Sequence, residues 1–252
     1  MKSKKEKILN LILPIITVVT LILVWAVSSA VIDSEYILPS VKVTAEKFFA
    51  LFTAKDFYTA FLSTLFRSLV AFVFSFSIGF ILAFVSVKIK FARKVIFPII
   101  SVMRALPTIA IVLLLLFWTN SKVAPIIVTL IVVLPTSYTH IESALFALDK
   151  TVTEAGRVDG ADEKQIFLMV ELPQITPSVY SGVGSGISLN FKLMVAAEVI
   201  SQTAYSLGYL LNTSKVYFEI AQMLALVVVS VIFGVLIETV FNFLSKKAGE
   251  WK

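Results

Sequence analysis

Four charged or amide side chains inside long apolar stretches are the residues of this sequence most able to do chemistry. They are Arg104, Asn190, Lys192 and Glu198. A charge in the bilayer interior is costly, so such residues commonly line a solute path or form buried pairs. We treat all four as candidates for a translocation path. For Arg104 and Lys192, a structural ion pair or hydrogen bond is an equally open alternative. Arg67 lies at the outer edge of an apolar stretch, where we expect it to snorkel.

Lys192 carries the most specific of these hypotheses. A lysine at a helix centre in the bilayer costs about 2.5–3.5 kcal/mol, and less near the interface. Glu198 lies on roughly the opposite side of an ideal helix, so the two side chains cannot pair easily. We therefore expect Lys192 to face a central cavity, where a cation attracts anions.

Clusters of the side chains that most enzymes use are absent. The sequence has no Cys and one His, His140, so it cannot build a Cys-based or His-based metal cluster alone. It contains no Walker A sequence, and its glycine-rich run, residues 182–186, lies inside an apolar stretch instead of between a strand and a helix. We expect a chain that is not an enzyme, holds no metal and binds no cofactor.

Long apolar stretches must position these residues. The sequence is 58% hydrophobic and only 15% charged, against about 25% charged residues in soluble domains. A membrane helix needs about 20 mostly apolar residues. We predict an all-α polytopic membrane protein, a single transmembrane domain over residues 1–252. Its six transmembrane helices are expected near residues 8–32, 68–87, 95–118, 123–139, 175–199 and 220–244.

The distribution of basic residues predicts the orientation. Fourteen Lys and Arg residues lie at the termini and in the second and fourth connections, against five in the other connections. By the positive-inside rule, both termini and the loop 140–174 are cytoplasmic. The formal net charge of +6 therefore needs no nucleic acid partner. In the first outer connection, 33–67, apolar residues at helical spacing predict a short amphipathic helix. It either lies at the membrane interface or packs on neighbouring spans.

The polar loop 140–174 predicts a short helix. Thr151 or Thr153 can cap it, with Glu154 in the first turn, where the helix dipole favours an acid. Ala155 and Gly156 leave one face without bulk. Such a face is a candidate docking surface for a soluble partner, and an ordinary solvated loop is the alternative.

The end of the loop also carries signals. Gly160, after Asp159, can end the helix in a left-handed conformation. Leu172-Pro173 is expected to turn the chain into the fifth span. In that span, small or polar residues recur every fourth position and predict close helix packing within the subunit or across a dimer. They are Ser178, Gly182, Gly186 and Asn190.

The loop resembles a motif of the permease subunits of bacterial binding-protein-dependent ABC importers. That motif reads Glu-Ala-Ala, three residues, Gly, nine residues, Ile, one residue, Leu-Pro. The sequence matches it at Glu154, Ala155, Gly160, Leu172 and Pro173, with Gly156 and Val170 in place of Ala and Ile. Other stretches are similar to the nitrate/sulfonate/taurine branch: Leu38-Pro39-Ser40, Thr64-Leu65-Phe66-Arg67-Ser68-Leu69, Arg104-Ala105-Leu106-Pro107, Ala197-Glu198 and Leu207-Gly208-Tyr209-Leu210.

The resemblance implies a permease of the bacterial cytoplasmic (inner) membrane. Cytoplasmic ABC ATPase subunits, which use ATP and Mg, would dock on the loop as on a coupling helix. Its residues there would be Glu154, Ala155, Gly156, Asp159, Gly160, Leu172 and Pro173. An extracytoplasmic binding protein would deliver a small organic anion or heterocycle, and two permease copies, expected as a homodimer, would form the path. The alternative is a secondary transporter or channel that ATP does not drive, although no internal repeat of the kind common in such transporters is visible.

Overall fold

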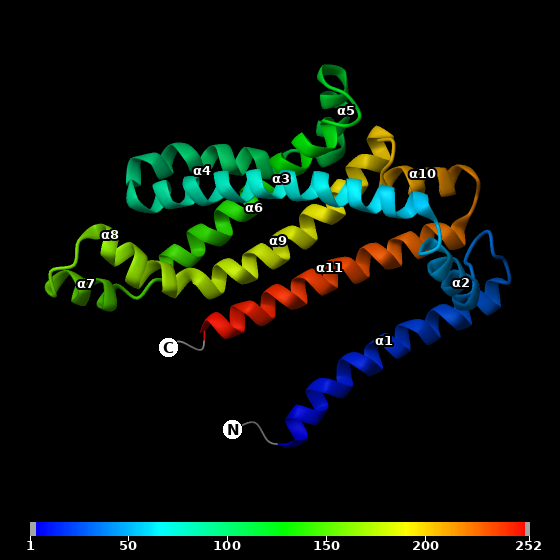
Figure 1. Cartoon of the computed structure of the whole chain (residues 1–252), viewed down its shortest axis with the longest axis horizontal. Coiled ribbons are helices and arrows are strands. Elements are labelled where there is room, and N and C mark those ends of the chain that lie inside the picture. Colours follow the sequence, from blue (N-terminus) through cyan, green and yellow to red (C-terminus); the bar gives the residue numbers. More distant parts are fainter. Residues whose placement is uncertain (1–3, 250–252) are drawn as a thin grey trace. The chain divides into compact units, whose positions relative to one another are not determined.

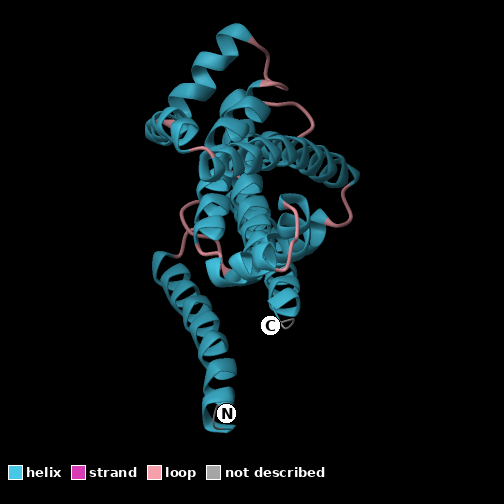
Figure 2. Ribbon diagram, turned by 90° about the vertical axis from the view of Figure 1, so that its left-hand side faces the viewer, coloured by secondary structure: helices cyan, strands magenta, loops and turns pink. Residues whose placement is uncertain are grey.

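The computed structural model describes residues 4–249, and side chains from residue 12 onward. Every regular element in that range is helical, as Figure 2 shows. Five helices are long and apolar enough to cross a membrane, and a sixth span is obtained if one sharply bent helix pair crosses as a unit. The predicted all-α membrane fold is thereby confirmed.

The helices follow the chain in the order shown in Figure 1. They are α1 (Lys4–Ile32), α2 (Val41–Leu51), α3 (Lys55–Lys88), α4 (Lys90–Ala105), α5 (Thr108–Trp118), α6 (Ala124–Phe146), α7 (Lys150–Val158), α8 (Glu163–Ile166), the π-helical segment η1 (Phe167–Glu171), α9 (Leu172–Ser201), α10 (Leu207–Val216) and α11 (Ile220–Gly249).

Contacts divide the chain into two compact units, described separately here. The first unit consists of the chain up to Tyr58 together with Leu210–Val229. The second unit consists of Thr59–Tyr209 together with the chain from Ser230 onward. In the first unit, α2 is the helix predicted for the outer connection. Ser40 caps its N-terminus by accepting a hydrogen bond from the Val43 amide, 3.3 Å away. The Trp25 indole donates to the Pro39 carbonyl at 2.9 Å and ties α1 to the start of α2.

In the second unit, α6 packs along α9, and α5 contacts both. Tyr138 and Ile141 of α6 and Ile175 of α9 lie in its core with at most 1% of their surface exposed. At Gly79 of α3, an added Cβ would lie 3.0 Å from the Tyr138 amide nitrogen. A glycine therefore lets the backbones of α3 and α6 approach closely.

The third predicted span is not one continuous helix. Instead, α4 and α5 meet at an angle of 95° around Leu106-Pro107. Leu106 is extended, with ψ of 127°, as expected for a residue before proline. Pro107 has no N–H to continue the hydrogen-bond ladder. The span predicted near 95–118 is therefore two helices, which make one span only if the bent pair crosses the membrane as a unit.

Two helices extend beyond their predicted spans. α3 begins at Lys55 instead of residue 68, and α6 continues to Phe146 instead of ending at 139. Neither added segment contains Pro or Gly, so nothing in the local sequence stops the helix. At 1.5 Å per residue, α3 is about 50 Å long. It is longer than the hydrocarbon core of about 30 Å, so polar residues near its ends can lie outside that core.

The turn predicted at Leu172-Pro173 is absent, because α8, η1 and α9 form one helical segment over Glu163–Ser201. The Leu172 amide bonds to the Phe167 carbonyl, five residues earlier, which is the π-helical pattern. Pro173 lies in the first turn of α9, a position at which proline costs little. The helix therefore has a π-helical segment just before this proline, and the chain does not turn there.

Candidate functional site

The N-terminus of α7 is capped by a residue that the sequence argument missed. The Asp149 side chain accepts a hydrogen bond from the Thr151 amide at 2.9 Å and another from the Thr151 hydroxyl at 2.6 Å. Capping by Thr151 or Thr153 was therefore the wrong prediction. An aspartate at this position satisfies a free amide and also places a negative charge at the positive end of the helix dipole.

The C-terminus of α7 is as predicted. Gly160 has φ of 83°, the left-handed conformation that glycine adopts without steric cost. Its amide bonds to the Arg157 carbonyl at 3.1 Å, and the Ala161 amide bonds to the Gly156 carbonyl at 3.0 Å. These two bonds form a Schellman motif, so both ends of α7 are fixed by specific hydrogen bonds.

The two small residues of α7 lie on different faces. Ala155 is exposed, whereas a Cβ added to Gly156 would lie 3.7 Å from Ile166 and 3.9 Å from Val170. Residues adjacent in a helix are about 100° apart, so the pair cannot make the single small-residue face expected above. Gly156 seats α7 against α8 and η1, and Ala155 belongs to the outer surface.

That outer surface, defined here as the coupling face, combines acidic and apolar side chains. Glu154 and Asp159 are exposed and have no ion-pair partner among the described residues. Val158 is 86% exposed and Met169 of η1 is 75% exposed. Large apolar side chains exposed beside charges are typical of a surface that another protein covers.

A short chain of contacts joins the coupling face to the membrane helices. Arg157 of α7 pairs with Glu163 of α8 at 3.0 Å, and Asp162 and Gln165 form a capping box at the start of α8. Glu171, at the end of η1, is 5% exposed and binds Lys88 of α3 at 3.0 Å. The segment is therefore anchored to α3 just before α9 begins.

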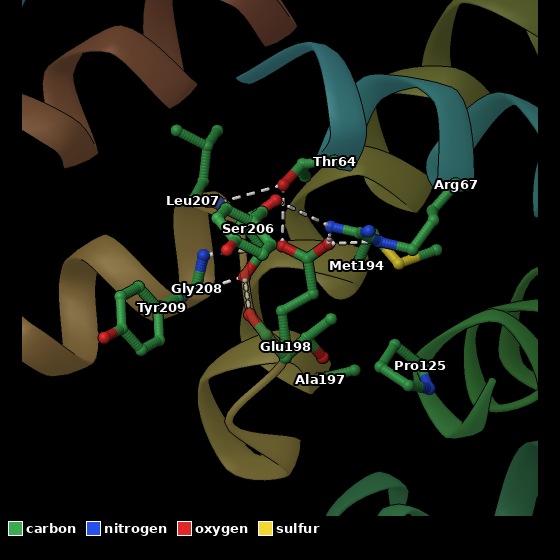
Figure 3. A network of polar contacts seen from close by, with 12 residues as sticks. Thr64, Arg67, Pro125, Met194, Ala197, Glu198, Ser206, Leu207, Gly208 and Tyr209 are labelled. Carbon is green, nitrogen blue, oxygen red and sulfur yellow. Dashed lines mark hydrogen bonds and ion pairs between the residues drawn. The ribbon is translucent and has the colours of Figure 1, made fainter. Parts of the chain in front are cut away.

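Glu198 is fully buried in a hydrogen-bond network at the other end of α9, shown in Figure 3. Its carboxylate pairs with Arg67 of α3 at 2.7 Å and accepts a hydrogen bond from the Thr64 hydroxyl at 2.8 Å. The Arg67 side chain is only 14% exposed. The expectation that Arg67 snorkels to the interface was wrong, because a buried acid lies within its reach.

The same network holds the start of α10. The Leu207 amide donates to the Thr64 hydroxyl at 2.9 Å, and the Gly208 amide donates to Glu198 at 3.4 Å. A Cβ added to Gly208 would lie 2.4 Å from the Cβ of Glu198 and 2.5 Å from the Val199 nitrogen. Only glycine fits there, so the network fixes α3, α9 and the first turn of α10 together.

The small-residue stripe of α9 lies at contacts with two helices. A Cβ on Gly182 would lie 2.2 Å from the His140 ring of α6, and one on Gly186 would lie 2.8 Å from the Phe72 ring of α3. The Ser178 carbonyl is 2.7 Å from Nε2 of His140. Asn190 is fully buried and donates to Ser68 of α3 at 2.6 and 2.7 Å. All four stripe residues therefore contact neighbouring helices within the chain.

Arg104 and Lys192 differ from Asn190 and Glu198 because both are exposed. Arg104, in the last turn of α4, reaches the Pro135 carbonyl at 3.5 Å. A Cβ added to Gly234 of α11 would lie 3.4 Å from Cε of Lys192, so the lysine stem lies against α11. No acidic partner within 4.0 Å is found for either cation among the described residues.

Sequence reasoning missed two buried acids at the end of the unit where α7 lies. Glu142 of α6 is 6% exposed, pairs with Arg93 at 3.0 Å and accepts a hydrogen bond from the Tyr138 hydroxyl at 2.7 Å. Glu171 pairs with Lys88, as described above. Lys88 and Arg93 are two of the basic residues in the second connection that predict the orientation. The available signal was that each acid lies within four residues of a predicted apolar span, Glu142 after 123–139 and Glu171 before 175–199.

Comparisons with known proteins agree with this architecture. Residues 75–249 match the family described as binding-protein-dependent transport system inner membrane component. A "Probable ABC transporter permease protein" of Brucella abortus is 24% identical over 74% of this chain and 74% of its own length. The riboflavin permease protein RibX of Chloroflexus aurantiacus is 24% identical, covering 73% of this chain and 69% of its own. The taurine permease protein TauC of Escherichia coli is also 24% identical, covering 63% and 58%.

A solved structure shares the fold. The crystal structure of an amino acid ABC transporter with histidines matches with a TM-score of 0.65 and 17% identity, over 76% of this chain and 94% of that chain. The family match covers well over half of the sequence and includes α6, the loop and α9. The chain therefore belongs to the family of inner membrane components of binding-protein-dependent transport systems, the permeases of ABC importers.

Proposed function

We propose that this permease forms part of a translocation path and that its coupling face docks a cytoplasmic ATPase. The observation that carries the proposal is the construction of α7. The helix is capped at both ends and exposes apolar and acidic side chains. A four-residue connection, 159–162, joins it to the continuous helical segment of α8, η1 and α9, and the Arg157–Glu163 pair bridges that connection. A force applied to α7 would therefore move α9. Such a rigid element with two alternative packings is what a switching transporter requires.

The sidedness of the second unit supports this role. The Lys88–Glu171 pair, the Arg93–Glu142 pair and α7 all lie toward the same end of the α6–α9 pair. The end of α11, with Lys246 and Lys247, reaches that end too, since Ser245 donates to the Pro177 carbonyl at 2.7 Å. Basic residues thus collect at one end, as expected for a cytoplasmic face. This supports our proposal that α7 is cytoplasmic, and the basic residues of the sequence lead us to propose the same side for both termini.

The family relationship supports the following proposed transport cycle. ATP and Mg bind to the ATPase subunits and not to this chain. Closure of the ATPase pair draws the coupling faces of two permease copies together, and α9 transmits the motion to the spans. An extracytoplasmic binding protein delivers the substrate to the opposite end. We take the permease pair to be a homodimer in the bacterial inner membrane.

The path residues divide by exposure. Lys192 and Arg104 remain available to a solute, whereas Asn190 and Glu198 are enclosed and hold the helices around the path. Two exposed cations favour a small organic anion, in line with the taurine relative, and the riboflavin relative supports a heterocycle as the other class.

Co-purification tests the docking role. Val158→Asp and Glu154→Lys each change an exposed side chain of α7 without touching its caps. We expect both variants to reach the membrane at the level of the unchanged chain and to lose the ATPase subunit of the same transport system. The matched control is Lys164→Gln, an exposed change on α8. Full ATPase recovery with both α7 variants would remove the docking role.

A further inference from the structure

We propose that the start of α4, together with α6, forms a binding site for the phosphate group of an anionic phospholipid. A pocket opens here in the second unit, between the end of α3, the first turns of α4 and the end of α6. It is lined by Ser86, Lys90, Arg93, Lys94, Phe97 and Phe146. The binding site goes beyond the transport role, since neither the path nor the coupling face includes it.

The N-terminus of α4 lacks a partner for its free amides. Ile89 is the N-cap residue, and no side chain caps the helix. The first turn of the 16-residue helix contains no acid, whereas Lys90, Arg93 and Lys94 all lie within its first five positions. The helix dipole and the free amides favour an anion at this end and disfavour cations. These features favour the binding of an anion at this end of the helix.

The charges of the pocket do not cancel. Arg93 is neutralised by Glu142, at 3.0 Å, and its guanidinium lies 4.9 Å from the centre of the Phe146 ring. Lys90 and Lys94 are exposed, and neither has an acid within 4.0 Å among the described residues. The pocket thus keeps two uncompensated ammonium groups beside free helix amides. A phosphate monoanion or diester would satisfy both.

A buried hydroxyl gives independent support for a ligand. Ser86 is 1% exposed, and its Oγ has no hydrogen-bond partner of regular geometry, although the Tyr138 phenol lies nearby. The serine is one of the residues that line the pocket. Buried hydroxyls are normally paired, and a headgroup oxygen would supply the missing partner.

The walls of the pocket favour a lipid over a free anion. Phe97 is 49% exposed and Phe146 is 53% exposed, and both line the same pocket as the lysines. An acyl chain can lie along these rings while its phosphate meets Lys90, Lys94 and the α4 amides. Basic pockets between membrane helices at the cytoplasmic side are suited to anionic headgroups. Only the choice of leaflet rests on the orientation proposed above.

Lipid retention on the assembled transporter tests the site. Phosphatidylglycerol and phosphatidylcholine would be offered in equal amounts, and bound lipid would be measured by native mass spectrometry. We expect the double variant Lys90→Gln/Lys94→Gln to lower phosphatidylglycerol affinity roughly thirtyfold, about fivefold per lysine. The matched control Lys246→Gln/Lys247→Gln removes the same charge from the end of α11 and should retain the lipid. Ser86→Ala should weaken binding by a smaller factor.

Three other outcomes would overturn the proposal. Equal loss in both double variants would show unspecific attraction to basic residues, and equal retention would show that no site exists. Inorganic phosphate in millimolar excess distinguishes the source of the anion. If it displaces phosphatidylglycerol fully, the pocket takes free phosphate and the lipid assignment is wrong. Loss of transport with unchanged lipid retention would concern the proposed function and not this site.

Discussion

Arg67 and Glu198 meet at 2.7 Å although 131 residues separate them in the sequence. The pair joins α3 to the last turn of α9, and Thr64 and Gly208 complete the hydrogen bonding of the carboxylate. An acid of this kind can be buried because its charge is both paired and hydrogen-bonded. Glu198 therefore stabilises the arrangement of α3, α9 and the start of α10. It can affect a solute only indirectly, by changing the positions of these helices.

Removing one partner of this pair should strongly destabilise the protein. We expect Arg67→Met to lower the stability of the folded state by about 3–5 kcal/mol, because Glu198 is left buried and unpaired. The double variant Arg67→Met/Glu198→Met should recover much of the loss. Thermal unfolding in detergent measures both. Arg157→Gln, which breaks an exposed pair with Glu163, should cost about 1 kcal/mol or less. If Arg67→Met and Arg157→Gln behave alike, the pair at Glu198 is not structural.

Gly208 should tolerate no side chain. Gly208→Ala places a Cβ within 2.4 Å of Glu198 and against the α9 backbone, so the start of α10 must move away. We expect a large loss of folded protein, measured by monodisperse yield after solubilisation. Gly249→Ala is the control, since its Cβ would lie 3.8 Å from Pro177, an ordinary contact. Normal yield of Gly208→Ala would show that α10 does not rest on α9 as described.

Gly160 isolates backbone conformation from packing. Its added Cβ would meet no atom within 4 Å, so only the φ of 83° resists substitution. Gly160→Val should cost about 1–2 kcal/mol locally, and Gly160→Asn should cost less, because asparagine tolerates the left-handed region. Hydrogen exchange of the α7 amides should rise in the valine variant, and ATPase recovery should fall with it. Identical exchange in the two variants would mean that the helix end is not under this control.

Cysteine labelling tests the proposed sidedness, since the sequence has no native Cys. Ala204 precedes α10 and Lys164 lies in α8, and both are exposed at opposite ends of the second unit. Ala204→Cys should react with a membrane-impermeant maleimide in intact cells, and Lys164→Cys only after the membrane is opened. Reaction of Lys164→Cys from outside would exclude docking of a cytoplasmic ATPase on α7.

Lys192 tests the path. Lys192→Met keeps the stem that lies against Gly234 and removes the charge. For an anionic substrate, uptake into ATP-loaded proteoliposomes should fall by on the order of tenfold, because the cation raises the local anion concentration. Protein level and ATPase association should hold. Lys215→Met, in the last turn of α10, is the control and should transport normally. Unchanged uptake with Lys192→Met would remove this residue from the path.

The sequence by itself determined the features that depend on neighbours along the chain. Apolar length predicted the membrane helices, and Gly160 predicted the left-handed end of α7, which the structure confirms. It also predicted α2 from apolar residues at helical spacing. These signals are local, because helix periodicity and capping involve residues only a few positions apart.

Only the tertiary structure decided which side chains meet. Lys88 and Glu171 are 83 residues apart and Arg93 and Glu142 are 49 apart, yet both pairs are formed. The 95° bend between α4 and α5 was not predicted, and it depends on how the two helices pack on α6. Helix packing fixes pairs and bends by bringing distant surfaces together, and no local pattern encodes which surfaces those are. The exposure that separates Lys192 from Glu198 has the same origin.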